Sequence, residues 1–346
     1  MKKILIFALV LGALTACSST PKQTLKVYNW GEYIDKSVIA DFEAEYKCQV
    51  IYDTYDSNEL MYTKLASGEK YDILVPTDHM VERLIAENKI QTLDLSKITN
   101  FGNLNPELLN RPFDPNNAHS IPYFYGNIGI IYNKNNVDRS VLEAEGWNFL
   151  RDPQFKERIY VYDSARDVFM MAYKSLGYSI NTTDEAQIEE AFNWLKEMNT
   201  ITKPIYIDET LIDNMINGNK DLAVDFSGDA AYVLSQNPDM DFFVPAEGTN
   251  LWTDSMVIPT DAENVDLAYK WINYMLRDDV ALKNTEYVGY TSPVTSAFNA
   301  VTAEGGTYYN NPAYAPRLDN PLDEVHQYSP LLVSILADKW TRVKAE

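Results

Sequence analysis

The feature that most constrains the fold is a regular alternation of strand-like and helix-like segments near the start of the chain. Short runs of apolar and β-branched residues are typical of strands, and they occupy residues 24–30, 48–55 and 71–77. Apolar residues at helical spacing lie between and after these runs, over residues 35–46, 57–68 and 78–88. Asp35 and Ser57 stand at helix N-cap positions, and Gly68 stands at a helix end. This order predicts a parallel sheet that is covered by helices on both faces.

A second series of the same kind follows after residues 99–126, which are rich in Asn and Pro and read as irregular. Residues 129–134 read as a strand that crosses into a second lobe. Residues 241–246 and 251–259 read as a last strand pair, of which the second member crosses back. Between these crossings, strands are predicted at residues 158–165, 204–207 and 221–226. Helices are predicted at residues 166–177, 184–198, 210–218 and 228–236, and an amphipathic one later at 264–278.

The predicted fold class is therefore α/β with two lobes, each a mostly parallel sheet flanked by helices, and with a ligand cleft between the lobes. The length of 346 residues exceeds the usual size of a single domain. We expect lobe 1 at residues 25–131 and 258–310, and lobe 2 at residues 132–257 and 311–346. Two lobes joined by more than one crossing form a hinged clamp around a small ligand.

The first 16 residues have the pattern of a secretory signal. Lys2 and Lys3 precede an apolar run that is too short to span a bilayer, and small residues follow it. The ending "LTAC" is similar to a bacterial lipobox, which predicts cleavage before Cys17 and a lipid on its sulfur. Residues 17–24 then serve as a polar tether. An ordinary signal peptide with a chance cysteine is the alternative.

The charge of the chain is strongly acidic. The net charge is −21, and the loss of Lys2 and Lys3 with the signal peptide gives −21 − 2 = −23. Such a surface repels nucleic acid and concentrates cations. Solubility alone also accounts for an acidic balance, so the charge does not identify the ligand.

Aromatic and acidic side chains gather just beyond the ends of the predicted strands, where ligands of open α/β sheets bind. Residues 285–289 are counted among these strands. The side chains at these ends are Trp30, Glu32, Tyr33, Thr77, Asp78, His79, Ser164, Asp167, Asp208, Phe226, Asp229, Trp252, Asp254 and Tyr290. Trp252 and Asp254 face one side of their strand because they are two residues apart. The list contains no Lys, and Arg166, next to Asp167, is the only cation at these strand ends. Ammonium groups pair with carboxylates, and aromatic faces attract cations and cover methylenes. The set therefore favours a slender organic cation. A polyamine is such a cation, because its ammonium groups alternate with runs of methylenes. Taken singly, Trp30 is equally consistent with a core residue, and Asp167 and Asp229 with helix caps.

From Leu25 to the C-terminus the chain is similar to the spermidine/putrescine-binding proteins of bacterial polyamine ABC transporters (PotD/PotF type). The resemblance rests on "YNWGEYI", "YDILVPT", "ITNFGNL", "RPFDPNNAHSIPY", "SARDVFMMAYKSLGY", "LWTDSMVIP" and "VGYTSP". It implies a periplasmic-binding-protein fold of type II that captures putrescine or spermidine and delivers it to a permease. The chain is then a binding protein without enzymatic activity, cofactor or metal. We expect a monomer in the periplasm or at the cell surface, anchored through Cys17, that binds no nucleic acid.

The resemblance also implies roles for single residues. Trp30, Glu32, Tyr33, Thr77 and His79 would line lobe 1. The remaining ligand-binding residues would be Asp167, Phe226, Asp229, Trp252, Asp254, Tyr290 and Gln327.

The sequence departs from the spermidine-preferring pattern in several places. Ser164 stands where that branch has an Asp, His79 where it has a Tyr, and Gly31 where the family has Thr or Ser. Asp229 matches the putrescine type. These departures favour putrescine as a good ligand, with spermidine close behind.

Other functions were weighed against this interpretation. A glycosidase needs a carboxylate pair in which one acid is protonated, and nothing in the sequence singles out such a pair. His79, His119 and His326 lie on unrelated segments, which argues against a metal or metal-chelate site. A sugar-binding protein would be expected to have neutral amides around its aromatics. A ligand sensor on the same fold stays open.

Overall fold

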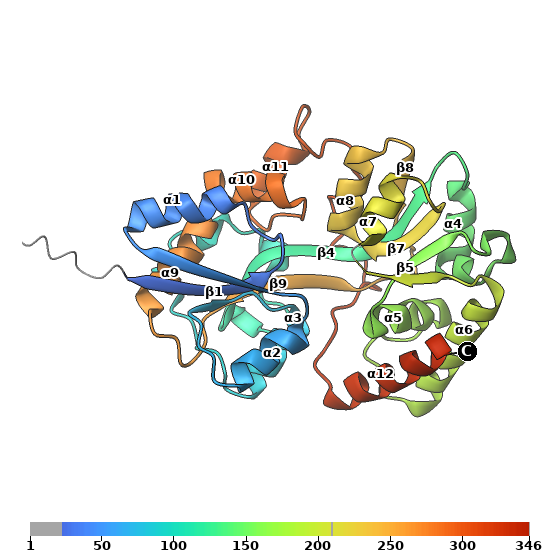
Figure 1. Ribbon diagram of the computed structural model, residues 1–346, viewed down its shortest axis with the longest axis horizontal. Coiled ribbons are helices and arrows are strands. Elements are labelled where there is room, and N and C mark those ends of the chain that lie inside the picture. Colours follow the sequence, from blue (N-terminus) through green and yellow to red (C-terminus); the bar gives the residue numbers. More distant parts are fainter. Residues whose placement is uncertain (1–22, 209, 346) are drawn as a thin grey trace, which may run out of the picture.

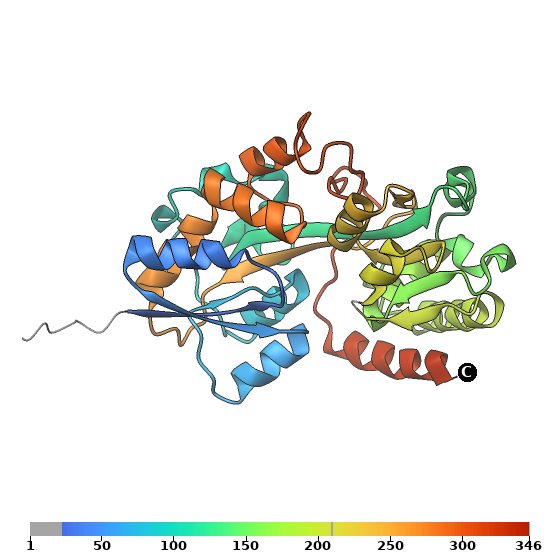
Figure 2. The ribbon, with the colours of Figure 1, turned by 45° about the horizontal axis from the view of Figure 1, so that its top comes forward.

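Two long strands, β4 (Ser120–Asn133) and β9 (Leu251–Val257), run side by side through the middle of the elongated molecule and join its two lobes (Figures 1 and 2). The structure is a computed structural model, and it describes residues 23–208 and 210–345. The signal sequence, Cys17 and most of the tether lie outside the described residues.

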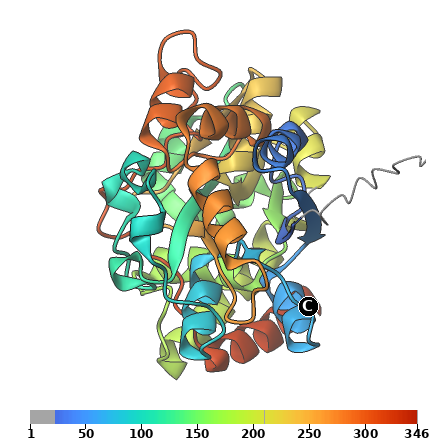
Figure 3. The same cartoon turned by 90° about the vertical axis from the view of Figure 1, so that its left-hand side faces the viewer.

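The first lobe holds the parallel strands that the sequence predicts. Strand β1 (Thr24–Trp30) pairs with β2 (Gln49–Tyr55) and with β3 (Ile73–Leu74), in both cases in parallel. Its helices are α1 (Lys36–Tyr46), α2 (Asn58–Ala66), α3 (Asp78–Ala86), α9 (Val265–Met275), α10 (Asp278–Val288) and α11 (Thr295–Thr302). The predicted caps form, because Asp35 and Ser57 accept hydrogen bonds from backbone N–H groups of the helices that follow them. Seen from the end of this lobe, helices surround the strands (Figure 3).

The second lobe repeats the arrangement. Its strands are β5 (Ile159–Tyr162), β6 (Ile205–Ile207), β7 (Leu222–Phe226) and β8 (Met240–Phe243), and β5 is parallel to both β6 and β7. Its helices are α4 (Arg139–Glu145), α5 (Ala165–Leu176), α6 (Glu185–Ile201), α7 (Thr210–Ile216), α8 (Ser227–Gln236) and α12 (Pro330–Ala345). Helix α12 returns to this lobe and lies along its lower face in Figure 1.

One continuous sheet runs through both lobes. Its strand order is β2-β1-β3-β9-β4-β7-β5-β6, with β8 paired to β4. The first half of β4 pairs with β9, and its second half pairs with β7 and β8, always antiparallel. Each lobe thus has a parallel interior, and antiparallel crossing strands join the two. This confirms the α/β fold class.

Each lobe has its own apolar core. In the first lobe, Val27, Ile73 and Met256 are buried with residues of α1 and α9. In the second lobe, Val161 and Phe169 are buried with the apolar side of α12. A further buried cluster joins Ala230 of α8 to Val301 of α11 and to Tyr308, so apolar contacts also link the two lobes.

Three predictions of local structure were wrong. Residues 120–126 were read as irregular but form the start of β4, because pairing with β9 overrides the local effect of Pro122. Strands β8 and β9 do not form a hairpin pair, since each pairs with a different part of β4. Residues 285–289 end helix α10 instead of forming a strand, and Gly289 closes the helix with a left-handed φ of 88°.

No helix within the described part of the chain is both long and apolar enough to cross a membrane.

Candidate functional site

The carboxylate of Asp254 is the centre of the site. Asp254 lies on the crossing strand β9 and is 5% exposed. Its two oxygens accept hydrogen bonds from the hydroxyls of Tyr33 and Thr77, each at 2.7 Å. Tyr33 follows β1 and Thr77 follows β3, so two parallel strand ends meet at this acid. Within residues 23–208 and 210–345, no Lys, Arg or His nitrogen forms an ion pair with it. Burial raises the pKa of Asp254 to about 7, and the charge of nearby Asp78 raises it further against the two hydrogen bonds.

A second buried acid, Asp78, anchors the same strand. It is fully buried at the start of α3 and accepts hydrogen bonds from the backbone N–H groups of His79 at 2.6 Å and Thr253 at 3.1 Å. Burial raises the pKa of Asp78 to about 7, against the lowering effect of His326 and these hydrogen bonds. Asp78 therefore ties the first lobe to β9, one residue before Asp254. The sequence places it at a strand end, but its burial depends on contacts with β9 that the sequence does not show.

Four aromatic rings from both lobes form a series of neighbours that begins at Tyr33, the hydrogen-bond partner of Asp254. The ring of Trp252 lies 6.0 Å from Phe226 of the second lobe and 5.5 Å from Tyr290 of the first, measured between centroids. Tyr290 in turn lies 5.3 Å from Tyr33. Within the described residues the buried indole N–H of Trp252 has no hydrogen-bond acceptor. The predicted aromatic residues of this group therefore converge on one place.

Further acids lie beside Tyr290. Burial raises the pKa of Tyr290 well above its usual value, and the charges of Asp229 and Asp225 and a hydrogen bond with Asp229 act in the same direction. Asp229 lies in the first turn of α8. The structure thus brings this predicted acid of the second lobe to the aromatic group around Asp254.

The start of α5 carries a mixed group of charges. Asp167 Oδ1 lies 3.6 Å from Nε2 of His326, a buried histidine from the segment before α12. Two buried nitrogens, His326 Nε2 and Arg166 Nη1, have no hydrogen-bond partner within the described residues. Burial lowers the pKa of His79 well below its usual value, and the positive charge of Arg166 adds to this effect. Asp167 therefore already lies close to His326 and acts electrostatically on Arg166.

Three predicted residues lie further out. The Trp30 indole donates to the carbonyl of Val75 at 2.9 Å. Glu32 is exposed in a left-handed turn with φ of 48°, 3.4 Å from the donating hydroxyl of Tyr287. Gln327 is exposed, and the structure buries its neighbour His326 instead. No periodic pattern in the sequence indicates that His326 is buried and Gln327 is exposed.

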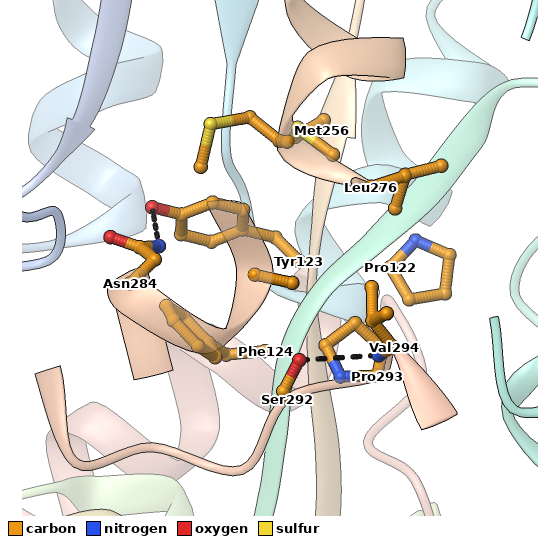
Figure 4. A pocket seen from close by; sticks show the side chains of 11 residues that line it. Pro122, Tyr123, Phe124, Met256, Leu276, Asn284, Ser292, Pro293 and Val294 are labelled. Atoms are coloured by element: carbon orange, nitrogen blue, oxygen red, sulfur yellow. Dashed lines mark hydrogen bonds between the residues drawn. The ribbon is translucent and has the colours of Figure 1, made fainter. Parts of the chain in front are cut away.

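A small pocket lies behind the site within the first lobe (Figure 4). It is lined by Tyr123 and Phe124, which pack against Tyr33, and by Asn284, whose amide donates to the Tyr123 hydroxyl at 3.0 Å. The Tyr123 hydroxyl donates in turn to the Tyr33 carbonyl at 2.6 Å. These residues hold Tyr33 in place from behind.

The described residues contain no group of three or more His, Cys, Asp or Glu side chains that could hold a metal ion.

The fold and this site define a solute-binding protein, and comparisons with known proteins place it more closely. A family model described as bacterial extracellular solute-binding protein matches residues 37–316, and the chain belongs to this family. This confirms a solute-binding protein rather than an enzyme.

The sequence relatives are polyamine-binding proteins by name. The spermidine/putrescine-binding periplasmic protein of Escherichia coli K12 is 39% identical over 299 residues, which cover 86% of this chain and 85% of the relative. The putrescine-binding periplasmic protein PotF of the same organism is 30% identical, and the match covers 100% of this chain and 99% of PotF. The predicted resemblance to the PotD/PotF type is confirmed.

Solved structures agree in fold. PotD of Streptococcus pneumoniae, a spermidine/putrescine ABC transporter substrate-binding protein solved with calcium and HEPES, has a TM-score of 0.82. It is 38% identical, and the match covers 94% of this chain and 99% of that one. The TpPotD lipoprotein of Treponema pallidum has a TM-score of 0.81 at 26% identity, covering 94% of this chain and 100% of that one.

Proposed function

We propose that this protein captures a linear polyamine between its lobes and delivers it to an ABC permease. The observation that carries the proposal is the setting of Asp254, a buried acid whose partners are the hydroxyls of Tyr33 and Thr77. A ligand ammonium would supply the missing positive charge, and charge-assisted hydrogen bonds are roughly twice as strong as neutral ones. The names of the relatives support the same ligand class.

The aromatic residues would bind the rest of the ligand. The faces of Trp252, Phe226 and Tyr290 would cover the methylenes between the ammonium groups. Because these rings come from both lobes, the ligand would hold the lobes together, and closure would remove water and strengthen each ion pair.

The acids also bear on which polyamine is preferred. Asp229 offers a second carboxylate close to Tyr290, whereas Asp167 lies 3.6 Å from the His326 imidazole. Two well-placed acids suit a diamine, and Ser164 supplies no third carboxylate. We therefore favour putrescine as a good ligand, with spermidine close behind.

The proposal extends to location and partners. The protein would be a monomer at the cell surface or in the periplasm, held near its permease by a lipid on Cys17. The lobes would divide at residues 131, 257 and 310, of which 131 lies near the end of β4 and 257 is the last residue of β9. Cys17→Ser should release the protein from the membrane fraction of the source cells, and a variant that stays in that fraction would contradict the anchor.

Isothermal titration calorimetry tests the ligand class. The purified protein is titrated with putrescine, spermidine and 1,4-butanediol, which matches putrescine without its charge, and also with maltose and ferric citrate. We expect heat with the amines alone. The proposal would be refuted if the diol bound as tightly as putrescine, or if neither amine bound. If spermidine gave heat but putrescine gave none, the preference for a diamine would be refuted.

A further inference from the structure

A glycine stands where the two lobes touch next to the site. Gly228 lies in the first turn of α8, at the inner edge of the second lobe, which faces the helices of the first (Figures 1 and 2). A Cβ atom on Gly228 would lie 2.4 Å from Cγ and Cδ2 of the Tyr290 ring. Real Cβ contacts are not this short, so the Tyr290 ring rests on a helix backbone where only glycine fits.

Backbone conformation does not explain this glycine. Gly228 is not among the glycines with positive φ, and it lies inside a helix, where alanine is the more favourable residue. Its neighbour Ser227 shares the same tight region, since Ser227 Oγ would lie 2.6 Å from a Cβ on Gly126. Gly126 also makes room for Trp252, its cross-strand partner on β9. Each glycine thus leaves room for an aromatic ring, Gly228 for Tyr290 and Gly126 for Trp252.

The position of Tyr290 controls the rest of the site. Its ring packs between Trp252 at 5.5 Å and Tyr33 at 5.3 Å, and its hydroxyl meets the Asp229 side chain. Tyr33 is held from behind by Tyr123. The Tyr290 ring therefore has little room to move back into the first lobe.

We infer that Gly228 is a positioning residue for ligand capture: by lacking a Cβ it lets the second lobe close onto Tyr290 and brings Asp229 to the edge of the slot. A methyl group at this position separates the lobes at the slot or pushes the ring towards Trp252. Both displacements disturb the contact between the lobes that the structure shows, and separation of the lobes in the free protein would relieve the clash. This inference rests on the proposed polyamine binding.

The test compares Gly228→Ala with Gly102→Ala. Gly102 is exposed, has no atom within 4 Å of a built Cβ and lacks a positive φ, so it is a matched control. We expect Gly228→Ala to weaken putrescine binding at least about tenfold, mainly through faster dissociation, with the melting temperature of the free protein kept. Calorimetry gives the affinity, and stopped-flow tryptophan fluorescence gives the dissociation rate.

A double-mutant cycle separates positioning from damage to the fold. In a Tyr290→Ala background the ring atoms that meet the new methyl group, Cγ, Cδ2 and Cε2, are gone, so Gly228→Ala should change the residual affinity by less than about twofold. A tenfold loss that persists in this background, or that comes with a lowered melting temperature, overturns the inference. Wild-type affinity in Gly228→Ala would also overturn the inference about Gly228, but it would not affect the proposed polyamine binding. If the wild-type protein binds no polyamine, both fail.

Discussion

Replacing Asp254 by Asn tests the central charge of the site with little change of shape. The carboxylate is 5% exposed and is held by Tyr33 and Thr77 at 2.7 Å. The amide oxygen of Asn can still accept one of these hydroxyls. What the variant lacks is the negative charge that a ligand ammonium would pair with. The expected effect is therefore on ligand affinity rather than on the fold.

The size of the loss follows from the strength of one charged hydrogen bond. Such a bond contributes about 1.5–3 kcal/mol, and each 1.4 kcal/mol is about a tenfold change in affinity. The pKa of Asp254 is raised to about 7, so at about pH 8 the acid is largely ionised and little free energy is needed to deprotonate it. Putrescine should then bind roughly 10- to 100-fold more weakly to Asp254→Asn than to the wild-type protein.

Titration calorimetry at about pH 8 measures this loss, at low and at moderate salt. Asp266→Asn is the matched control, because the side chain of Asp266 is 91% exposed and the substitution removes the same charge from the surface. The control should bind putrescine within about twofold of the wild-type protein, since exposed charges are screened. If Asp254→Asn also binds within that margin, Asp254 does not hold an ammonium group and the assigned site is wrong.

Three further predictions follow from the packing and the buried acids. Trp252→Ala should weaken putrescine binding about tenfold through lost contact with the methylenes and lost cation–π attraction, and unchanged affinity by calorimetry would argue against its role. The ligand-free protein should lose stability to urea as the pH rises from about 4 to about 7, by at most about 1.4 kcal/mol per pH unit for each acid, because burial raises the folded-state pKa of Asp78 and Asp254 to about 7. The sign follows from proton binding: the folded protein keeps protons that the unfolded chain has already released, so Asp78→Asn should flatten the slope, and an unaltered slope would contradict the burial argument. Trp340→Ala should cost about 3–5 kcal/mol in urea unfolding but leave putrescine affinity unchanged, because Trp340 belongs to the second-lobe core, packs against Tyr206 and donates to Asp163 at 2.7 Å.

Short-range sequence patterns correctly predicted those helices and strands whose formation depends on neighbouring residues. Asp35 and Ser57 cap the helices that they were expected to cap, and the parallel strands of both lobes follow the apolar runs. Each of these features depends on a few consecutive residues, so short-range patterns describe them well.

The errors arose where distant residues decide the structure. Pro122 made the start of β4 look irregular, although β9 pairs with it from more than a hundred residues away. The β-branched and aromatic residues near Val288 suggested a strand, but buried residues at helical spacing, such as Ala281 and Thr285, belong to α10. In the site, the sequence placed Asp78 and Asp254 at strand ends but did not indicate that both are buried, and Gln327 stays a prediction next to the buried His326. All of these depend on contacts between segments that are far apart in the chain.

The placement of the central acid on a crossing strand has a consequence for ligand-driven closure. Strand β9 pairs with β3 of the first lobe through Val257, and its other end pairs with β4 close to the point where β4 turns to β7 of the second lobe. Asp78 fixes the N–H of Thr253, so Asp254 keeps its position relative to the first lobe. In the structure Phe226 and Asp229 of the second lobe already lie at the aromatic group around Asp254, so a diamine bound to both acids would hold the lobes in this arrangement. A ligand with a single ammonium group would satisfy Asp254 without pairing with Asp229, so a monoamine such as butylamine should bind more weakly than putrescine and leave the lobes further apart, which small-angle X-ray scattering can detect. Equal compaction with butylamine and putrescine would show that closure does not depend on the second acid.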